Sequence, residues 1–209
     1  MSSSRQSRHF SLIRGFHLAD FFTVGNGCCG TAAIFLTMDH VREARVETAY
    51  WAGLLVVAAL FLDIMDGRIA RGRHAASPLG RELDSLADVI SFGVAPACLA
   101  YAVGMTGLWD ALALLYFVAC GISRLARYNI TAERLAGSGG KVTYFEGTPI
   151  PTSLVLVLII IFLVWQRRIG PDLPLGVAGL GPFDLHPLVL LFVLSGSLMI
   201  SKTLRIPKP

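Results

Sequence analysis

The sequence predicts an all-α integral membrane protein, a bundle of six transmembrane helices. Three observations lead to this prediction: an apolar composition, apolar stretches of span length that recur along the chain, and basic residues concentrated between them. Of the 209 residues, 54% are apolar and only 15% are charged, whereas soluble domains have roughly 45–50% apolar and about 25% charged residues. This composition excludes a soluble globular protein, and it excludes a disordered chain, which lacks apolar side chains to bury.

Six apolar stretches are close to the length that crosses a membrane. A helix of about 17–25 residues spans a hydrocarbon core ~30 Å thick, and helices satisfy their backbone polar groups internally, as lipid requires. The first stretch contains Gly25, Asn26, Gly27 and Gly30, which permit close helix contact or leave room for a ligand. The expected spans are Phe21–Met38, Ala49–Ala70, Val89–Thr106, Leu108–Leu125, Pro149–Trp165 and Pro187–Ile200.

The basic residues predict the orientation of this bundle. With six spans both termini lie on one side, and fourteen of the 18 Lys and Arg residues fall on that side. The positive-inside rule therefore places both termini and the loops 68–81 and 124–148 in the cytoplasm. We expect a multi-pass protein of the cell (inner) membrane. Despite the net charge of +4, the basic residues form no single stripe, so no nucleic-acid partner is expected. The four on the other side are Arg42, Arg45, Arg167 and Arg168.

The chain divides into a short N-terminal basic amphipathic segment, residues 1–18, and a membrane domain, residues 19–209. In the first segment apolar residues alternate with arginines, which fits a helix lying on an anionic leaflet, with a disordered basic tail as the alternative. Residues 170–185 are rich in Gly and Pro and form the longest expected extramembrane turn.

The four cysteines and five histidines predict neither a disulfide framework nor a Cys/His metal site. Cys28 and Cys29 are adjacent, Cys98 and Cys120 each lie alone in an apolar run, and the histidines are scattered. A disulfide framework needs more cysteines in a short secreted chain, and zinc sites need ligand spacings that are absent here. We interpret the cysteines as reduced.

Two pairs of aspartates lie at the ends of apolar stretches. Asp63 and Asp66 are three residues apart, and Asp84 and Asp88 are four apart, so each pair shares one face of a helix. Ionisable residues at membrane depth are costly and therefore indicate function.

Four carboxylates on two neighbouring helices would repel one another unless cations lay between them. Hard divalent ions such as Mg²⁺ or Mn²⁺ prefer such oxygen ligands. The alternative is that each aspartate is paired with a nearby arginine at the membrane interface. We favour a metal site, because four aspartates stand at helical spacings with small residues between them. The nearby arginines are Arg68, Arg71, Arg73 and Arg81.

Small residues accompany the aspartates at Gly67, Ala70 and Gly80. A phosphate or nucleotide must approach the backbone closely, and larger side chains would block it. Helix packing in the membrane is the alternative role of these residues. Arg71 lies one turn beyond Gly67, where its guanidinium is placed to bind phosphate oxygens.

The whole pattern, Asp63-x2-Asp66-Gly67-x2-Ala70-Arg71-x8-Gly80-x3-Asp84-x3-Asp88, resembles the complete signature of the CDP-alcohol phosphotransferases. The resemblance implies a six-helix membrane enzyme, usually a homodimer, that binds two divalent cations, Mg²⁺ or Mn²⁺, and a CDP-linked substrate at the cytoplasmic side. It further implies that Asp63, Asp66 and Asp84 are the principal metal ligands, and that Asp88 is the general base and also touches a metal.

Neighbouring segments resemble one branch of that family, the bacterial and archaeal phosphatidylserine synthases. This chain departs mildly from the pattern of that branch at Thr148 and Ile150. The resemblance implies phospholipid biosynthesis by transfer of the phosphatidyl group from CDP-diacylglycerol to the hydroxyl of L-serine, which gives phosphatidylserine and CMP. The matching segments are 23–26, 83–88, 91–97, 123–129 and 145–151.

The resemblance also implies where the two substrates bind. For Thr23 and Asn26 the alternative is an interhelical hydrogen bond. The residues expected to contact CDP-diacylglycerol are Thr23, Asn26, Asp66, Gly67, Ala70, Arg71, Ser77 and Gly80.

Serine carries a carboxylate and an ammonium, so its pocket needs a cation and an acceptor. Arg124 and Arg127 lie one turn apart at the cytoplasmic end of the fourth expected span, and either is placed to bind the carboxylate. Asn129 or Glu146 is placed to receive the ammonium. The alternative is that the two arginines only enforce topology, because the positive-inside rule places arginines there.

Two other functions fit parts of the sequence. One is a CDP-alcohol phosphotransferase with another alcohol acceptor or an archaeal ether-lipid donor, although an anionic acceptor would need more cations. The other is a divalent-ion transporter whose acidic residues bind the permeating ion. Gly67, Ala70, Arg71 and Gly80 argue against transport, which needs neither a phosphate-sized gap nor an arginine beside the carboxylates.

Overall fold

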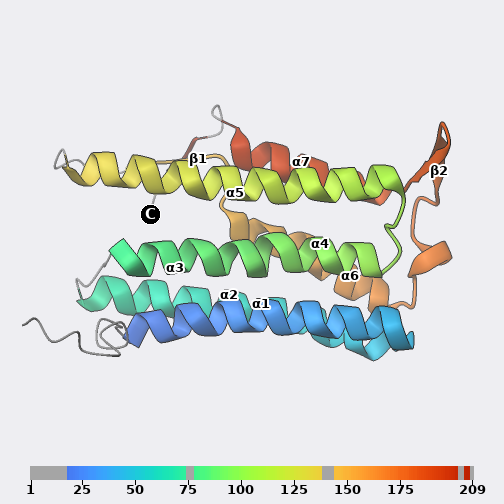
Figure 1. Cartoon of the computed structure of the whole chain (residues 1–209), viewed down its shortest axis with the longest axis horizontal. Helices are drawn as coiled ribbons and strands as arrows, with labels where there is room; N and C mark the ends of the chain where they lie inside the picture. The colour runs from blue at the N-terminus through green and yellow to red at the C-terminus, as the bar shows by residue number, and fades with distance from the viewer. Residues whose placement is uncertain (1–17, 74–77, 138–143, 202–204, 208–209) are drawn as a thin grey trace, which may run out of the picture.

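The chain folds mainly into helices that run along one common axis (Figure 1). The computed structural model describes residues 18–73, 78–137, 144–201 and 205–207, so the predicted N-terminal segment lies almost entirely outside the described residues. A π-helical segment, Val89–Val94, joins α3 to α4 and makes them one rod. The helices are α1 (Leu18–Glu43), α2 (Val46–Arg73), α3 (Pro78–Asp88), α4 (Ala95–Ala102), α5 (Leu108–Gly137), α6 (Leu154–Trp165) and α7 (Leu190–Ile200).

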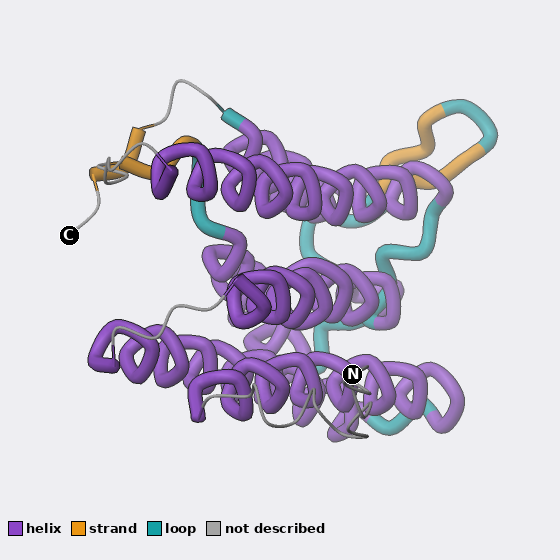
Figure 2. The backbone as a smooth tube through the Cα atoms, turned by 60° about the vertical axis from the view of Figure 1, so that its left-hand side comes forward, coloured by secondary structure: helices purple, strands orange, loops and turns teal. Residues whose placement is uncertain are grey.

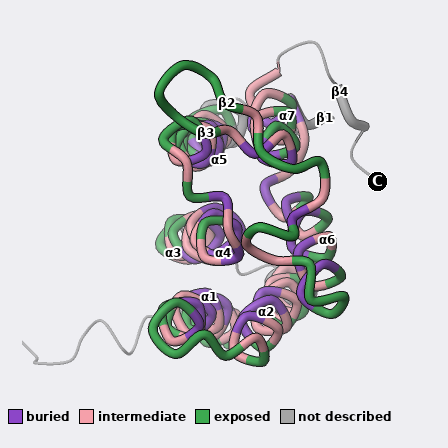
Figure 3. Tube along the Cα trace, turned by 90° about the vertical axis from the view of Figure 1, so that its right-hand side faces the viewer, coloured by how far each residue is buried: buried purple, intermediate pink, exposed green. Residues whose placement is uncertain are grey.

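Viewed from one end, the helices stack in layers (Figure 3). The first layer is α1 with α2, the middle layer is the α3–α4 rod with α6, and the last layer is α5 with α7. The middle rod contacts α1 on one side and α5 on the other. The polar residues of α3 therefore meet side chains from both outer layers.

Four described helical segments are long and apolar enough to cross a membrane: 18–43, 46–69, 79–102 and 108–131. The third begins at Leu79 rather than at the expected Val89, because helical sequence continues back through Asp84 and Asp88. The last two apolar helices are shorter, Ile150–Trp165 and Pro187–Ile200. Each of them begins with a 3₁₀ turn that contains proline, Ile150–Ser153 and Pro187–Val189.

Short strands correct the expectation of a purely α-helical chain. β1 (Tyr144–Glu146) pairs with β4 (Arg205–Pro207), and β2 (Ala178–Leu180) pairs with β3 (Phe183–Leu185), both antiparallel. The two pairs lie at opposite ends of the bundle (Figure 2). The β2–β3 hairpin falls in the expected long turn, which also contains a 3₁₀ turn (Gly170–Asp172). Gly181 supplies the positive φ that a two-residue hairpin turn needs.

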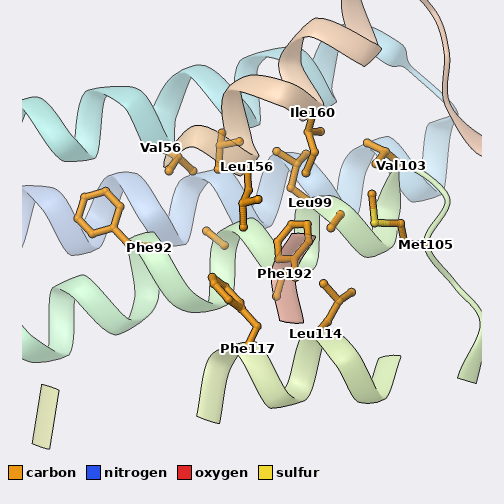
Figure 4. Close-up of a cluster of buried hydrophobic side chains, with 14 of the residues drawn as sticks. Val56, Phe92, Leu99, Val103, Met105, Leu114, Phe117, Leu156, Ile160 and Phe192 are labelled. Atoms are coloured by element: carbon orange, nitrogen blue, oxygen red, sulfur yellow. The ribbon is translucent and has the colours of Figure 1, made fainter. Parts of the chain in front are cut away.

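The core lies where the three layers meet (Figure 4). Phe92, Leu99, Phe117 and Phe192 are buried there, and the rings of Phe117 and Phe192 pack edge to face with centroids 5.3 Å apart. Many large apolar side chains point outward instead, which is costly in water and favourable in lipid. They include Phe21, Phe35, Met38, Trp51, Phe61, Leu115 and Trp165.

Helix α1 packs closely against the middle rod at Gly30. A Cβ atom on Gly30 would lie 2.7 Å from the Cα atom of Ser91, in the π-helical segment, so a larger residue would force the helices apart. A Cβ atom on Gly27 would meet Ala87 at 3.5 Å. The small residues of the first expected span thus permit close helix contact, and they bring α1 against the predicted site.

Candidate active site

Three of the four predicted carboxylates converge between α2 and α3. One carboxylate oxygen from each of Asp63, Asp66 and Asp84 lies within 4.8 Å of the others. Asp88 follows one turn after Asp84 on α3 and is almost completely buried. The spacings of three and four residues predict this arrangement, because each pair lies on the helix face that meets the other pair.

Helix α1 places one polar side chain against each pair. Thr23 Oγ1 donates a hydrogen bond to Asp66 Oδ2 (2.7 Å), and Asn26 Nδ2 donates one to Asp88 Oδ1 (3.2 Å). Both donors are buried. Thr23 and Asn26 thus make the interhelical hydrogen bonds that were the alternative to substrate contact, and their partners are the predicted site carboxylates.

The four carboxylates have few hydrogen-bond or ion-pair partners among the described residues. Within the described residues, no basic side chain lies within ion-pairing distance of Asp63, Asp66, Asp84 or Asp88, including Arg68. The side chains of Arg71 and Arg73, two of the arginines proposed as alternative partners, lie outside the described residues. Asp84 Oδ1 and Asn26 Oδ1 are buried without a hydrogen bond, as is Thr148 Oγ1.

This donor set fits a divalent cation. The converging atoms are carboxylate oxygens, which are the preferred ligands of Mg²⁺ and Mn²⁺. An unpartnered buried oxygen such as Asp84 Oδ1 is costly unless something else binds it. Asp63, Asp66 and Asp84 are therefore the residues that could hold a metal, with Asp88 beside them.

The predicted donor-binding residues line the same end of α2 and α3. Gly67, Ala70 and Arg71 follow Asp66 in the last turns of α2, and Gly80 lies in the first turn of α3. Ser77 lies outside the described residues, as do the side chains of Ala70 and Arg71. The small residues thus lie on the two helices that carry the carboxylate cluster, close to it in sequence.

Arg124 lies on α5, in the layer on the other side of α3 from α1 and α2. It is only 8% exposed and interacts electrostatically with Asp88. Its guanidinium carbon lies 5.7 Å from the centroid of the Tyr128 ring, a cation–π distance. Arg127, the other predicted cation, is partly exposed, so the two arginines are not equivalent.

The two predicted ammonium acceptors differ as well. Asn129 is buried, and its Nδ2 donates to Ser85 Oγ (3.0 Å) and Glu82 Oε1 (3.3 Å), both on α3. It therefore joins α5 to α3 one turn closer to the helix end than Arg124. Glu146 lies in β1 opposite Arg205 of β4, and its side chain lies outside the described residues.

One charged residue next to the site is not among the predicted site residues. Asp20, in the first turn of α1, is 4% exposed and interacts electrostatically with Asp66. Its signal was present, since Asp20, Thr23 and Asn26 are spaced by three residues and form one polar stripe. That stripe is the face of α1 that turns toward α2 and α3.

Comparison with known proteins identifies the family to which this geometry belongs. Residues 16–196 match the family model for CDP-alcohol phosphatidyltransferase. The chain is a member of the CDP-alcohol phosphatidyltransferase family. The matched range contains all four aspartates, the polar stripe of α1 and Arg124, and it ends before β4.

Several curated relatives of this chain carry the name CDP-diacylglycerol–serine O-phosphatidyltransferase. The protein from Saccharomyces cerevisiae is 41% identical over 204 residues, covering 96% of this chain and 74% of the relative. That from Bacillus subtilis is 37% identical over 142 residues, covering 67% and 72%. That from Helicobacter pylori strain 26695 is 42% identical over 134 residues, covering 63% and 54%. The family resemblance drawn from the aspartate pattern is thereby confirmed.

Proposed function

We propose that this protein transfers the phosphatidyl group of CDP-diacylglycerol to the hydroxyl of L-serine, releasing CMP and forming phosphatidylserine. The observation that carries the proposal is the cluster of Asp63, Asp66 and Asp84, which lacks counterions among the described side chains and has Asp88 and Arg124 beside it. The names of the relatives support serine as the acceptor.

The residues divide into a donor side and an acceptor side. Asp63, Asp66 and Asp84, with Asp88, would hold two divalent cations, Mg²⁺ or Mn²⁺, which when bound neutralise the phosphate charge of the donor. Thr23 orients Asp66 by its hydrogen bond. The remaining donor contacts are assigned to Asn26, Gly67, Ala70, Arg71, Ser77 and Gly80.

On the acceptor side, Asp88 takes the proton from the serine hydroxyl. The hydroxyl oxygen forms a bond to the phosphorus that carries the diacylglycerol, and the bond from that phosphorus to the CMP oxygen breaks. Asn26 holds the Asp88 carboxylate through its Nδ2, so the carboxylate is oriented before serine arrives. Positioning and charge neutralisation supply most of the catalysis in such a transfer.

Arg124 is the residue that we assign to the serine carboxylate. It is buried within electrostatic range of Asp88, and a guanidinium binds a carboxylate with two parallel hydrogen bonds. A carboxylate on Arg124 would bring the hydroxyl of the same serine toward the base. Arg127 remains the alternative cation for the carboxylate, and Asn129 or Glu146 remains the acceptor for the ammonium.

We further propose the membrane topology and assembly. The six apolar helical segments cross the bilayer, with both termini and the carboxylate end in the cytoplasm of the cell (inner) membrane, because the basic residues concentrate on that side. Local thinning of the bilayer would accommodate the two shorter helices. The enzyme acts among membrane lipids as a homodimer, as its family implies.

An assay of CMP release tests the proposal. The purified protein, supplied with CDP-diacylglycerol and Mg²⁺ or Mn²⁺, is given L-serine or one of a panel of other alcohols: glycerol phosphate, inositol phosphate and choline. We expect CMP release with serine together with a phosphatidylserine product. CMP release with another alcohol and not with serine would contradict the serine assignment and leave the family chemistry standing.

A further inference from the structure

The helix that carries Asp88 changes its winding directly after that residue. Val89–Val94 is π-helical, whereas α3 before it and α4 after it are α-helical. The sequence supplies a cause in Pro96. Proline has no amide hydrogen, so it cannot bond the carbonyl of Phe92 four residues earlier, and its ring crowds that carbonyl. Single π turns within α-helices occur frequently at functional sites.

A hydroxyl from another part of the chain bonds the carbonyl that Pro96 leaves. Ser153 Oγ donates a hydrogen bond to the Phe92 carbonyl oxygen, at 2.7 Å. Ser153 ends the 3₁₀ turn before α6, and both Ser153 and Phe92 are fully buried. A buried carbonyl without a partner costs about 1–3 kcal/mol, so this hydroxyl stabilises the segment that contains Phe92.

The opposite side of the π-helical segment is held by α1. Ser91 Oγ donates to the backbone carbonyl of Asn26 (2.9 Å), and the side chain of the same Asn26 donates to Asp88. All three residues are buried, and Gly30 allows the close approach. The segment that begins next to Asp88 is therefore fixed between α1 and the 3₁₀ turn before α6.

We propose that Ser153 is a positioning residue for the transfer reaction. Through the Phe92 carbonyl it holds the π-helical segment in the register that presents Asp88 to the acceptor hydroxyl. The proton still passes from that hydroxyl to Asp88 as the new oxygen–phosphorus bond forms. Ser153 takes no part in the proton transfer. The inference rests on the proposed function, because it assigns Asp88 as the base.

The neighbouring Thr152 provides a matched control. It lies in the same 3₁₀ turn, and its Oγ1 also donates to a backbone carbonyl, that of Pro149 (2.7 Å). Unlike Ser153, Thr152 is exposed, and among the described residues its Oγ1 bonds only Pro149, which directly precedes the turn. Removing its hydroxyl tests whether any lost bond in this turn affects the reaction.

The experiment compares steady-state kinetics of the purified full-length variants, per folded molecule. For Ser153→Ala we expect kcat to fall about 10- to 100-fold, since a small displacement of a general base costs this much, with KM for both substrates within about 2-fold of wild type. Ser153→Thr keeps the donor and should restore most of kcat, and Thr152→Val should match wild type. A Ser153→Ala enzyme with wild-type kcat would overturn the proposal. So would a Ser153→Thr enzyme whose kcat is no higher than that of Ser153→Ala.

Pro96→Ala tests the same inference if Ser153→Ala accumulates too little folded protein. Alanine restores an amide that competes for the Phe92 carbonyl, so kcat should fall with both KM values unchanged. An unchanged kcat would overturn the proposal. If wild type accepts another alcohol instead of serine, the proposed function fails by itself, and the Ser153 comparison is made on CMP release with that alcohol.

Discussion

The bundle contains buried carboxylates at both of its ends, and their surroundings differ. Asp110, at the start of α5, accepts hydrogen bonds from the backbone amides of Gly107 (3.0 Å) and His186 (2.8 Å), and its Oδ2 lies 2.6 Å from His186 Nδ1. At the other end, Asp84 Oδ1 is buried without a partner, beside two more carboxylates. Asp110 has the partners of a structural residue, whereas the Asp84 cluster leaves one buried carboxylate oxygen, Asp84 Oδ1, without a hydrogen bond and available to a ligand.

This contrast predicts opposite costs for losing a carboxylate. Asp110 joins α5 to the loop before α7, so its loss leaves buried amides unpaired. Loss of a carboxylate from the Asp84 cluster removes repulsion between like charges. Stability should therefore suffer at one end of the bundle and activity at the other.

The largest effect is expected at the cluster itself. Asp84→Asn or Asp66→Asn should lower turnover at least about 1,000-fold, because a cation site is worth several kcal/mol in the transition state. Thermal stability in detergent should stay at the wild-type value or rise. Excess chelator should abolish wild-type activity, and added Mg²⁺ or Mn²⁺ should restore it. Full activity in chelator would refute the metal dependence.

A somewhat smaller loss is expected at Asp88, where binding and chemistry separate. Asp88→Asn keeps the volume of the side chain but cannot take a proton, so transfer should fall about 100- to 10,000-fold. CDP-diacylglycerol binding, measured by isothermal titration in detergent, should remain close to wild type. A variant that makes phosphatidylserine at the wild-type rate would show that Asp88 is not the base.

The third effect concerns the acceptor alone. Arg124→Ala should raise KM for serine about 10- to 150-fold, equivalent to ~1.5–3 kcal/mol for a charge-assisted hydrogen bond, with little change in KM for CDP-diacylglycerol. Arg124→Lys keeps the charge but loses the paired geometry and should recover only part of the affinity. Arg168→Ala, which removes an arginine from the loop at the opposite end, serves as control. Equal changes in both KM values would indicate that Arg124 only enforces topology.

The smallest effect on catalysis is expected at Asp110. Asp110→Ala should lower the free energy of unfolding by about 1–3 kcal/mol through the unpaired amides and imidazole. The kcat and KM values per folded molecule should stay within about 2-fold of wild type. Thermal inactivation curves and kinetics on the same preparation measure both quantities. A selective loss of kcat would place Asp110 in the reaction and remove the distinction between the two ends.

Local patterns in the sequence predict much of this arrangement. Apolar length marks the helices, and the spacing of Asp63 with Asp66 and of Asp84 with Asp88 indicates shared helix faces. The contacts that complete the site join distant segments: Thr23 reaches Asp66, Asn26 reaches Asp88, and Ser153 reaches Phe92. Such contacts depend on how the layers stack, which no local spacing specifies.

Some structural features could not be predicted from the sequence patterns near them. Pro96 inside an apolar span is compatible with an ordinary kink, and the sequence does not distinguish a kink from a π-helical segment. His186 and Asp110 are 76 residues apart, so their pairing depends on the loop that carries β2 and β3. The strands themselves are three residues each, too short to produce an alternating pattern.

Direct measurement of cation binding tests the difference between the two ends most closely. Mn²⁺ bound to the purified protein, counted by electron paramagnetic resonance of the free ion, should reach two ions per wild-type chain. Asp84→Asn should lose at least one of them or bind it far more weakly, while Asp110→Ala should bind both as wild type does. Equal Mn²⁺ binding by wild type and Asp84→Asn would contradict the assignment of Asp63, Asp66 and Asp84 to a metal site.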